Sequence, residues 1–431
     1  MDNTFQIIFI GVFIVTALVG VAIFATGSLS GGGDDQLNVS FTIWGEWESD
    51  TFDKVLETSG LSDRNGITIN YESIASNQLE NRLINALARD NGPDVLLMPH
   101  TQIINFSDLI TVIGTDFYSL RQFRDTFIDG GEIFSTSEGI LALPVAVDPL
   151  VMYWNRDIFA NANILTPPRN WDDVSDSVKR ITVLGNNQRI HTAGISLGTY
   201  RNVSFYKEII STLLLQTGNN IVGKNSEDRY TSLLGNSFGS TESAVGMYTQ
   251  YANPSSDFYS WNNTFESDFS AFTSGNLGLY LAPASSISRI RSQNPNLNFD
   301  VSLVPRLEGG VNQSYGEIYG FAIMNQAQNK QIILEALKLL TDYSMAESII
   351  SETNMSPVRR DILSESVRDP YKQVFINAAF SSRGWLDPNP DKTAEIFANI
   401  INNVNSGQLT TLQAIKNADN ALESIMQSVN N

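Results

Sequence analysis

The stretch of sequence that decides the fold is Leu141-Ala-Leu-Pro-Val-Ala-Val-Asp-Pro-Leu-Val-Met-Tyr-Trp-Asn155. Its apolar side chains predict a strand, but Pro144 and Pro149 interrupt it. A proline has no amide hydrogen to donate to a neighbouring strand, so prolines are rare in the middle of a sheet. The stretch therefore suits a chain that crosses between two domains better than a central strand. A length of 431 residues also fits two domains.

Strands and helices alternate in the residues before this stretch. Polar and apolar side chains alternate in two segments, and two other segments have helical spacing. The predicted elements are strands over 37–43, 67–71 and 95–98, a helix over 50–57, and a helix that Ser76 caps and Asp90-Asn-Gly-Pro93 stops. Strands joined by short helices in this way are typical of a parallel sheet covered on both faces.

The first of these strands ends in an unusual group of side chains. Trp44, Glu46 and Trp47 follow one another at its carboxyl end. Because ligands bind at the carboxyl ends of strands in such sheets, this segment is a candidate binding edge. In the second half, the pattern predicts helices from Trp171, over 267–275, around 332–340, over 393–404 and over 411–429, and a strand over 277–282.

Composition excludes several classes of function. The chain has no cysteine and only two histidines, so disulfides, thiolate zinc sites, cysteine nucleophiles and multi-histidine metal centres are ruled out. A net charge of −19 argues against nucleic acid, which binds clustered Lys and Arg. No cofactor motif is expected, and His100, which follows a predicted strand, is interpreted as a hydrogen-bonded loop residue.

Three short motifs resemble catalytic or metal-binding sequences and fail on inspection. The Gly194 to Gly198 segment fits a serine nucleophile turn, but no histidine follows it, as that fold requires. Gly218 to Lys224 nearly completes a phosphate-binding loop, but Asn225 replaces the hydroxyl that binds magnesium. The 387–391 segment lacks the glycine and the closing glutamate of a calcium loop, and reads as a loop leading into a helix.

The remaining candidate residues are aromatic or acidic and lie at the ends of predicted elements. They are Trp44, Glu46, Trp47, Asp148, Tyr153, Trp261, Tyr319 and Trp385. Aromatic rings cover the apolar faces of sugars, and carboxylates accept strong hydrogen bonds from sugar hydroxyls. The set therefore favours a carbohydrate ligand, although a tryptophan taken alone is more often part of a core.

The N-terminus carries an apolar run. Between Asp2 and Asp34 there is no charged residue, and Phe5 to Thr26 is almost entirely apolar. This run is long enough for a membrane-spanning helix, which needs roughly 20 residues. A cleaved signal peptide is the alternative, but no basic segment precedes the run. Residues 1–36 are therefore expected to form a membrane anchor followed by a flexible Gly/Ser/Asp tether.

Several segments together resemble a known family. They are Trp44-Gly45, Asn91 to Val95, Leu143 to Leu150 with Tyr153 to Asp157, Pro168 to Trp171, Phe272 to Gly275, Val304-Pro305, Gly320 to Ile323 and Ser356 to Arg360. In their order and spacing they resemble the family 1 extracellular solute-binding proteins of ABC importers, which include maltose-binding protein. The resemblance covers the chain from about Leu37 to the C-terminus.

The resemblance implies an α/β, two-lobed, type II periplasmic-binding-protein-like fold, with doubly wound sheets joined by a hinge and a ligand enclosed between the lobes. Lobe 1 would comprise 37–146 with 317–350, and lobe 2 would comprise 147–316 with 351–431. It also implies no catalysis, a monomer, an ABC transporter permease as partner, and a body outside the cytoplasm. Because the lipidated cysteine of membrane-bound members is absent, the apolar N-terminal helix would replace it.

The resemblance also assigns roles to residues. Glu46 and Trp47 would lie in the first ligand-contacting loop, Asp148 would be an acidic sugar ligand, and the stretch Tyr315 to Gly320 would face the cleft. Maltose binders have aromatic, acidic and basic side chains where this chain has Met98, Thr101 and Gln102, and a stacking tryptophan where it has Ala284. A sugar or oligosaccharide other than maltodextrin is therefore expected.

Two other functions stay open at the level of sequence. A glycoside hydrolase would use paired carboxylates such as Glu46 and Asp148, which must lie about 5 to 10 Å apart across the bond that is cut. A ligand sensor or adhesion protein would use the same binding fold without serving a transporter.

Overall fold

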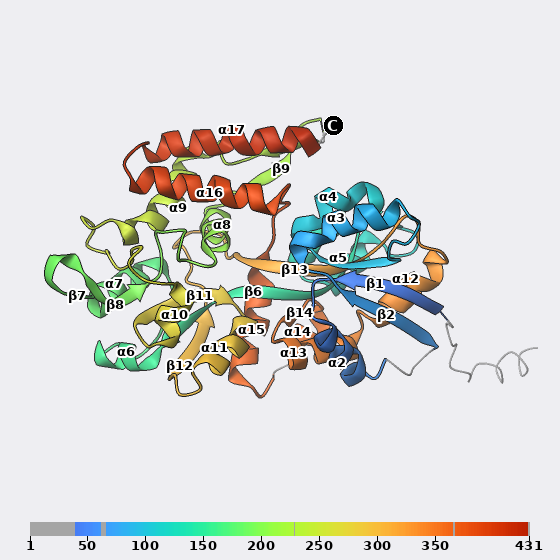
Figure 1. The fold of residues 1–431 in the computed structure, drawn as a ribbon, viewed down its shortest axis with the longest axis horizontal. Helices are drawn as coiled ribbons and strands as arrows, with labels where there is room; N and C mark the ends of the chain where they lie inside the picture. Colours follow the sequence, from blue (N-terminus) through green and yellow to red (C-terminus); the bar gives the residue numbers. More distant parts are fainter. Residues whose placement is uncertain (1–38, 62–65, 228, 365–366, 430–431) are drawn as a thin grey trace, which may run out of the picture.

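The computed structural model describes residues 39–429 apart from 62–65, 228 and 365–366. The described chain folds into two α/β lobes that lie side by side (Figure 1). The predicted anchor and tether, residues 1–36, lie outside the described residues. Within the part of the chain that the structure describes, no helix has the length and apolar character needed to cross a membrane.

The first lobe begins as the sequence predicts. Strand β1 (Val39–Gly45) pairs in parallel with both β2 (Ile67–Ser73) and β3 (Val95–Pro99). Helices α2 (Ser49–Ser59) and α3 (Ser76–Leu87) connect these strands. One detail of the prediction is wrong: Ser76 is the first helical residue and does not cap α3, because Ala75 occupies the capping position.

The stretch that decides the fold forms a single strand, β6 (Leu143–Asn155), and all of its 13 residues are buried. It joins the lobes as predicted, but it is also a central strand, contrary to the prediction from its prolines. Up to Pro149 it pairs with β13 (Ser314–Ile323), and from Leu150 onward with β11 (Leu277–Pro283). Pro149 lies where the strand changes partners, which is where a missing amide hydrogen disturbs the sheet least.

Strand β13 is a second connection between the lobes. Tyr315 packs in the core of the second lobe, whereas Ile318 packs in the core of the first. Within the described residues, the main sheet has 11 strands, in the order β2-β1-β3-β13-β6-β11-β8-β7, with β12, β14 and β15 pairing off this path. The two predicted sheets are therefore continuous through β6 and β13.

The other described elements follow the predicted α/β pattern. The first lobe adds α4 (Ile103–Phe106), α5 (Leu120–Thr126), α12 (Lys330–Leu339), α13 (Tyr343–Thr353), β14 (Ser356–Pro357) and α14 (Arg360–Leu363). The second lobe contains α6 (Arg156–Asn161), α7 (Trp171–Ile181), β7 (Val183–Leu184), β8 (Ile190–Ile195), α8 (Tyr206–Gln216), β9 (Val222–Lys224), β10 (Tyr230–Ser232), α9 (Phe238–Thr249), α10 (Asp268–Thr273), α11 (Ser286–Gln293), β12 (Phe299–Leu303), β15 (Ser382–Arg383), α16 (Pro390–Asn405) and α17 (Thr411–Val429).

Each lobe has its own hydrophobic core. The first core draws on 39–147 and on 318–363, and the second on 150–315 and on residues from Phe375 to Met426. Helix α15 (Pro370–Ser381) contributes to both cores, with Ile376 in the first and Phe375 in the second. Residues 351–363 pack in the first core, although the sequence placed them in lobe 2.

Candidate functional site

The first lobe presents Glu46 and its neighbours to the space between the lobes. Glu46 follows β1 directly, as expected for a residue at the carboxyl end of a strand. The side-chain amide of Gln102, just before α4, donates to Glu46 Oε1 at 2.5 Å and to Ser76 Oγ at 3.0 Å. Burial raises the pKa of Glu46 to about 7, and the nearby charge of Glu317 adds to the rise.

Strand β13 places Glu317 and Tyr319 beside Glu46 and Trp47. The Tyr319 hydroxyl donates to Glu317 Oε2 at 2.8 Å. The rings of Trp47 and Tyr319 meet edge to face, with centroids 5.7 Å apart. Three residues predicted from different parts of the sequence, Glu46, Trp47 and Tyr319, are thus brought together around Glu317.

Asp148 lies on β6, directly opposite Glu317 on β13. Its carboxylate accepts hydrogen bonds from the Ser285 amide at 3.1 Å and from the Ser285 hydroxyl at 2.5 Å. Burial raises the pKa of Asp148 to about 7 despite these bonds, and the charge of Glu317 contributes. Asp148 therefore connects the hinge strand to the loop before α11 and faces another carboxylate.

The second lobe contributes the first turn of α8. Lys207 Nζ donates to Asp387 Oδ2 at 2.5 Å, to Thr393 Oγ1 at 2.8 Å and to the Pro390 carbonyl at 3.0 Å. The adjacent Glu208 is half-buried, and burial raises its pKa to about 7. The charge of Glu317 adds to this rise, and the charge of Lys207 opposes it. Glu208 therefore lies within electrostatic reach of Glu317.

Three of the predicted residues are core residues of their lobes. Trp44 is buried in the first lobe, with the Arg82 guanidinium over its ring at 5.1 Å. Tyr153 is fully buried and donates its hydroxyl to the carbonyls of Pro283 and Ala284. Trp261 has no exposed surface, stacks on Phe265 and donates to Asn202.

Trp385 occupies an intermediate place. Its indole nitrogen donates to Ser211 Oγ at 3.1 Å, and its ring packs near Phe397 in the second core. Lys207 Nζ lies 5.4 Å from the centre of the same ring. Trp385 therefore supports the base of the cluster from the second lobe but exposes only 4% of its surface.

His100 is a structural residue, as predicted. It is fully buried, and its Nδ1 accepts a hydrogen bond from the Ile318 amide at 3.1 Å. Burial lowers its pKa to about 3, so the ring stays neutral. The His100 ring lies so close to Gly384 that a side chain at position 384 would collide with it. His100 thus packs the first lobe against the segment just before Trp385.

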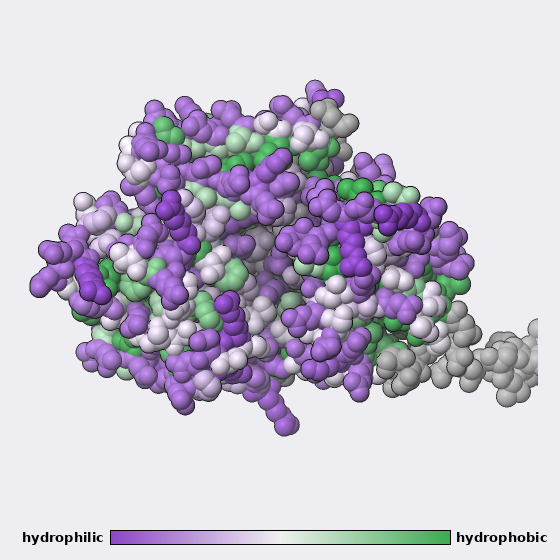
Figure 2. Space-filling model, viewed as in Figure 1, coloured by the Kyte–Doolittle hydropathy of each residue, from purple (hydrophilic) through white to green (hydrophobic). Residues whose placement is uncertain are grey.

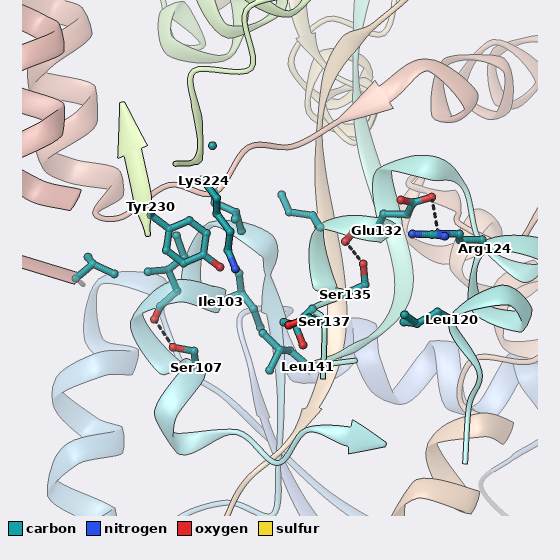
Figure 3. Close-up of a pocket in the computed structure, with 16 residues that line it drawn as sticks. Ile103, Ser107, Leu120, Arg124, Glu132, Ser135, Ser137, Leu141, Lys224 and Tyr230 are labelled. Carbon is teal, nitrogen blue, oxygen red and sulfur yellow. Dashed lines mark hydrogen bonds and ion pairs between the residues drawn. The ribbon is translucent and has the colours of Figure 1, made fainter. Parts of the chain in front are cut away.

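Two cavities between the lobes lie on opposite faces of α4. The larger, about 580 Å³, is lined by Ile103, Ile104 and Ser107 of the first lobe and by Lys224, Tyr230 and Leu386 of the second (Figure 3). The smaller, about 220 Å³, is lined by Ser76 and Gln102 and by Asn389 to Asp391. The larger volume falls in the range of small-molecule sites. Figure 2 shows the surface hollowed between the lobes. We call this space, together with the carboxylates Glu46, Asp148, Glu208 and Glu317, the interlobe crevice. Gln102, which is bonded to Glu46, lines the smaller cavity, whereas none of the four carboxylates lines either cavity.

The sequence missed several residues of the crevice. Glu317 lies within the stretch Tyr315 to Gly320, which the family resemblance predicted to face the cleft, but Glu317 itself was not predicted as a ligand-binding residue. Lys207, Glu208 and Ser285 had no signal in the sequence, because their neighbours in space lie far away along the chain. Among the residues that the structure describes, no group of three or more His, Cys, Asp or Glu side chains is arranged to hold a metal ion.

Solved structures share this architecture. The cyclic alpha-maltosyl-1,6-maltose binding protein from Arthrobacter globiformis matches with a TM-score of 0.73 at 16% identity, over 90% of this chain and 99% of that one. A cyclo/maltodextrin-binding protein complexed with maltotetraose matches with a TM-score of 0.72 at 15% identity, over 93% and 99%. An ABC transporter solute-binding protein from Thermotoga lettingae, bound with alpha-D-tagatose, matches with a TM-score of 0.66 at 17% identity, over 90% and 99%. These likenesses establish the fold.

Sequence comparison gives the family. Binding proteins of Brucella abortus (strain 2308) and Brucella suis biovar 1 (strain 1330) are each 22% identical to this chain over 429 residues, covering 95% of it and 97% of their own length. The sequence profile of the bacterial extracellular solute-binding proteins matches residues 47–346, which is most of the chain. The chain therefore belongs to the family of bacterial extracellular solute-binding proteins.

Proposed function

We propose that this protein captures a carbohydrate, either a sugar or an oligosaccharide, in the interlobe crevice. The observation that carries the proposal is the pair of rings formed by Trp47 and Tyr319 beside the carboxylates of Glu46 and Glu317. Rings and carboxylates together suit a ligand with apolar ring faces and many hydroxyls. Two solved structures with the same fold support this choice, because one is complexed with maltotetraose and the other is bound with alpha-D-tagatose.

Capture would involve closure of the two lobes about β6 and β13. Both strands run from one core to the other, so a change of backbone angles near Pro149 and Gly316 would move the lobes relative to each other. The ligand would then be held by side chains of both lobes, with Asp148 at the connection itself.

We further propose that the bound sugar is delivered to an ABC transporter permease, with the body outside the cytoplasm. Membership in an extracellular solute-binding family supports that location. The apolar run Phe5 to Thr26 would anchor the protein, which would act as a monomer. Uptake of the identified sugar by cells that lack this protein, with and without its return on a plasmid, tests the transport step.

Titration calorimetry of the protein against a panel of sugars and oligosaccharides tests the central proposal. Binding of at least one carbohydrate, with release of no reducing ends, is the expected result. Binding of another solute class with no binding of any carbohydrate would contradict it. Release of reducing ends would instead indicate hydrolysis by paired carboxylates.

A further inference from the structure

The interlobe crevice contains more negative than positive charge. Glu46, Asp148 and Glu208 each lie close enough to Glu317 for its charge to raise their pKa values, and Asp148 is paired directly with Glu317 across β6 and β13. Asp148 is buried, and the other three carboxylates are half-buried. Bringing like charges together under partial burial costs free energy unless a cation compensates them or the carboxylates take up protons, as their raised pKa values show.

The basic group nearest to this cluster is already bonded to other oxygens. Among the described residues, Lys207 is the cation whose charge acts on Glu317 and Glu208. Its ammonium group is bonded to a fifth carboxylate, Asp387, which is fully buried, and to two further oxygens. The other ionisable groups coupled to the four carboxylates are tyrosine hydroxyls, whose pKa values are raised and which are therefore neutral: those of Tyr71, Tyr153, Tyr206, Tyr248, Tyr315 and Tyr319. His100, which is also neutral, lies beside Lys207. None of the four carboxylates therefore has an ion pair with a basic side chain among the described residues.

A second, independent observation points to a missing donor. Gln102 is 8% exposed, and its amide nitrogen contacts Glu46 and Ser76. Its carbonyl oxygen is buried and accepts no hydrogen bond from any described residue. A buried acceptor without a donor costs roughly 1–3 kcal/mol. Since this oxygen has no solvent contact in the present arrangement, a donor would reach it when the lobes move.

We infer that the ligand is a basic sugar, a carbohydrate that carries a protonated amino group. The inference rests on the proposed function and narrows it to a substrate class. The ammonium group would lie among Glu46, Glu317 and Asp148, where it supplies the positive charge that the cluster lacks.

The chemistry of an ammonium group fits these surroundings better than that of a hydroxyl. An ammonium is a donor at each of its three hydrogens and accepts nothing, so each bond can go to a carboxylate or to the Gln102 carbonyl. Hydrogen bonds between charged groups are roughly twice as strong as those between neutral groups. A neutral sugar would use the same acceptors, but it would leave the mutual repulsion of the carboxylates in place.

A set of tetramers with one backbone tests the inference. Calorimetry at about pH 7 compares three tetramers that differ only in the substituent on carbon 2 of each sugar ring. Cellotetraose has a hydroxyl there, the tetramer of N-acetylglucosamine has an acetamide, and the tetramer of glucosamine has an amine. Maltotetraose and spermidine complete the set, as a neutral sugar of other linkage and a cation that is not a sugar. The protein is the full chain in a detergent without sugar groups.

The glucosamine tetramer is expected to bind at least ten-fold more tightly than the three neutral tetramers, and added salt should reduce this ratio. Glu317→Gln should remove most of the preference, and Asp148→Asn serves as a second variant should the first fail to fold. Glu335→Gln, which removes a half-buried carboxylate on α12 that pairs with Lys338 at 3.5 Å and lines neither cavity, should leave the ratio unchanged.

The outcomes separate the inference from the proposed function. Equal or tighter binding of a neutral tetramer overturns the inference and leaves carbohydrate capture standing. Binding of spermidine with no sugar bound overturns carbohydrate capture and keeps only the need for a cation. Binding of no compound in the set overturns the inference.

Discussion

The two faces of the interlobe crevice arise differently along the chain. The face of the first lobe is built by residues at the carboxyl ends of strands, such as Glu46 and Trp47 after β1, together with Gln102 soon after β3. The face of the second lobe comes from the start of α8 and from Asp387, which lie 180 residues apart in the sequence. The positions of the first set can be predicted from the repeating βαβ pattern of the sequence. The second set comes together only in the tertiary structure.

The largest expected effect is a loss of stability on replacing Trp261, a tryptophan of the second core rather than of the crevice. Trp261→Ala in the second lobe should lower the free energy of unfolding by about 3–5 kcal/mol, because it empties a site with no exposed surface. Chemical denaturation measures this loss. The affinity of the folded protein for its sugar should stay the same, and a variant of unchanged stability with weakened binding would place Trp261 in the site instead.

The next effect tests the buried ion pair of the second face. Lys207→Met should lower the free energy of unfolding by about 3 kcal/mol, because it leaves the buried Asp387 carboxylate without its cation. The matched control is Lys207→Met with Asp387→Asn, which removes both charges and should recover part of the loss. If the single and the double variant are equally stable, the pair contributes no more than its separate side chains.

The prediction from sequence was good where local pattern sufficed. The order of β1, α2, β2, α3 and β3 followed from alternation and helical spacing, and the crossing role of β6 followed from its two prolines. The central position of β6 was missed, because the prolines argue against it until the change of partner strands at Pro149 is known.

The candidate site was harder to predict, for a physical reason. Aromatic residues serve cores and ligands alike, and both Trp261 and Trp47 are buried. Only their contacts distinguish them, because Trp261 stacks on Phe265 and donates to Asn202, whereas Trp47 meets Tyr319 and its indole nitrogen has no partner among the described residues. The facing of Glu317 and Asp148 depends on antiparallel pairing between strands 169 residues apart, which no local pattern records. Charge clusters of this kind become visible only when the tertiary structure is known.

A smaller effect compares two tryptophans of the same loop. Trp47→Phe should weaken sugar binding about five-fold, because it removes an indole nitrogen that has no hydrogen-bond partner among the described residues and is left for a ligand. Trp44→Phe is the matched control, since that ring packs under Arg82 within the first lobe. Calorimetry with the identified sugar measures both, and equal losses of affinity would remove the distinction between them.

The smallest effect concerns pH and compares the crevice carboxylates with ordinary surface ones. Burial raises the pKa of Glu46, Asp148 and Glu208 to about 7, whereas the same groups in an unfolded chain titrate near 4. Between about pH 4 and pH 7 the folded protein therefore holds more protons than the unfolded chain, so its stability falls as the pH rises through this window and levels off above it.

Because two of the three groups are half-buried and partly screened by water, most of the effect comes from Asp148, and the expected loss between pH 5 and pH 6 is about 1 kcal/mol. Thermal unfolding without sugar, followed across these pH values, measures it. Asp148→Asn should flatten the profile, since it removes the most buried of the three carboxyls. Glu335→Gln should not, because that carboxylate is only half-buried and pairs with Lys338 on α12. Stability that rises with pH over the same window would mean that these carboxylates are compensated within the protein, and the contrast between the crevice and the surface would then disappear.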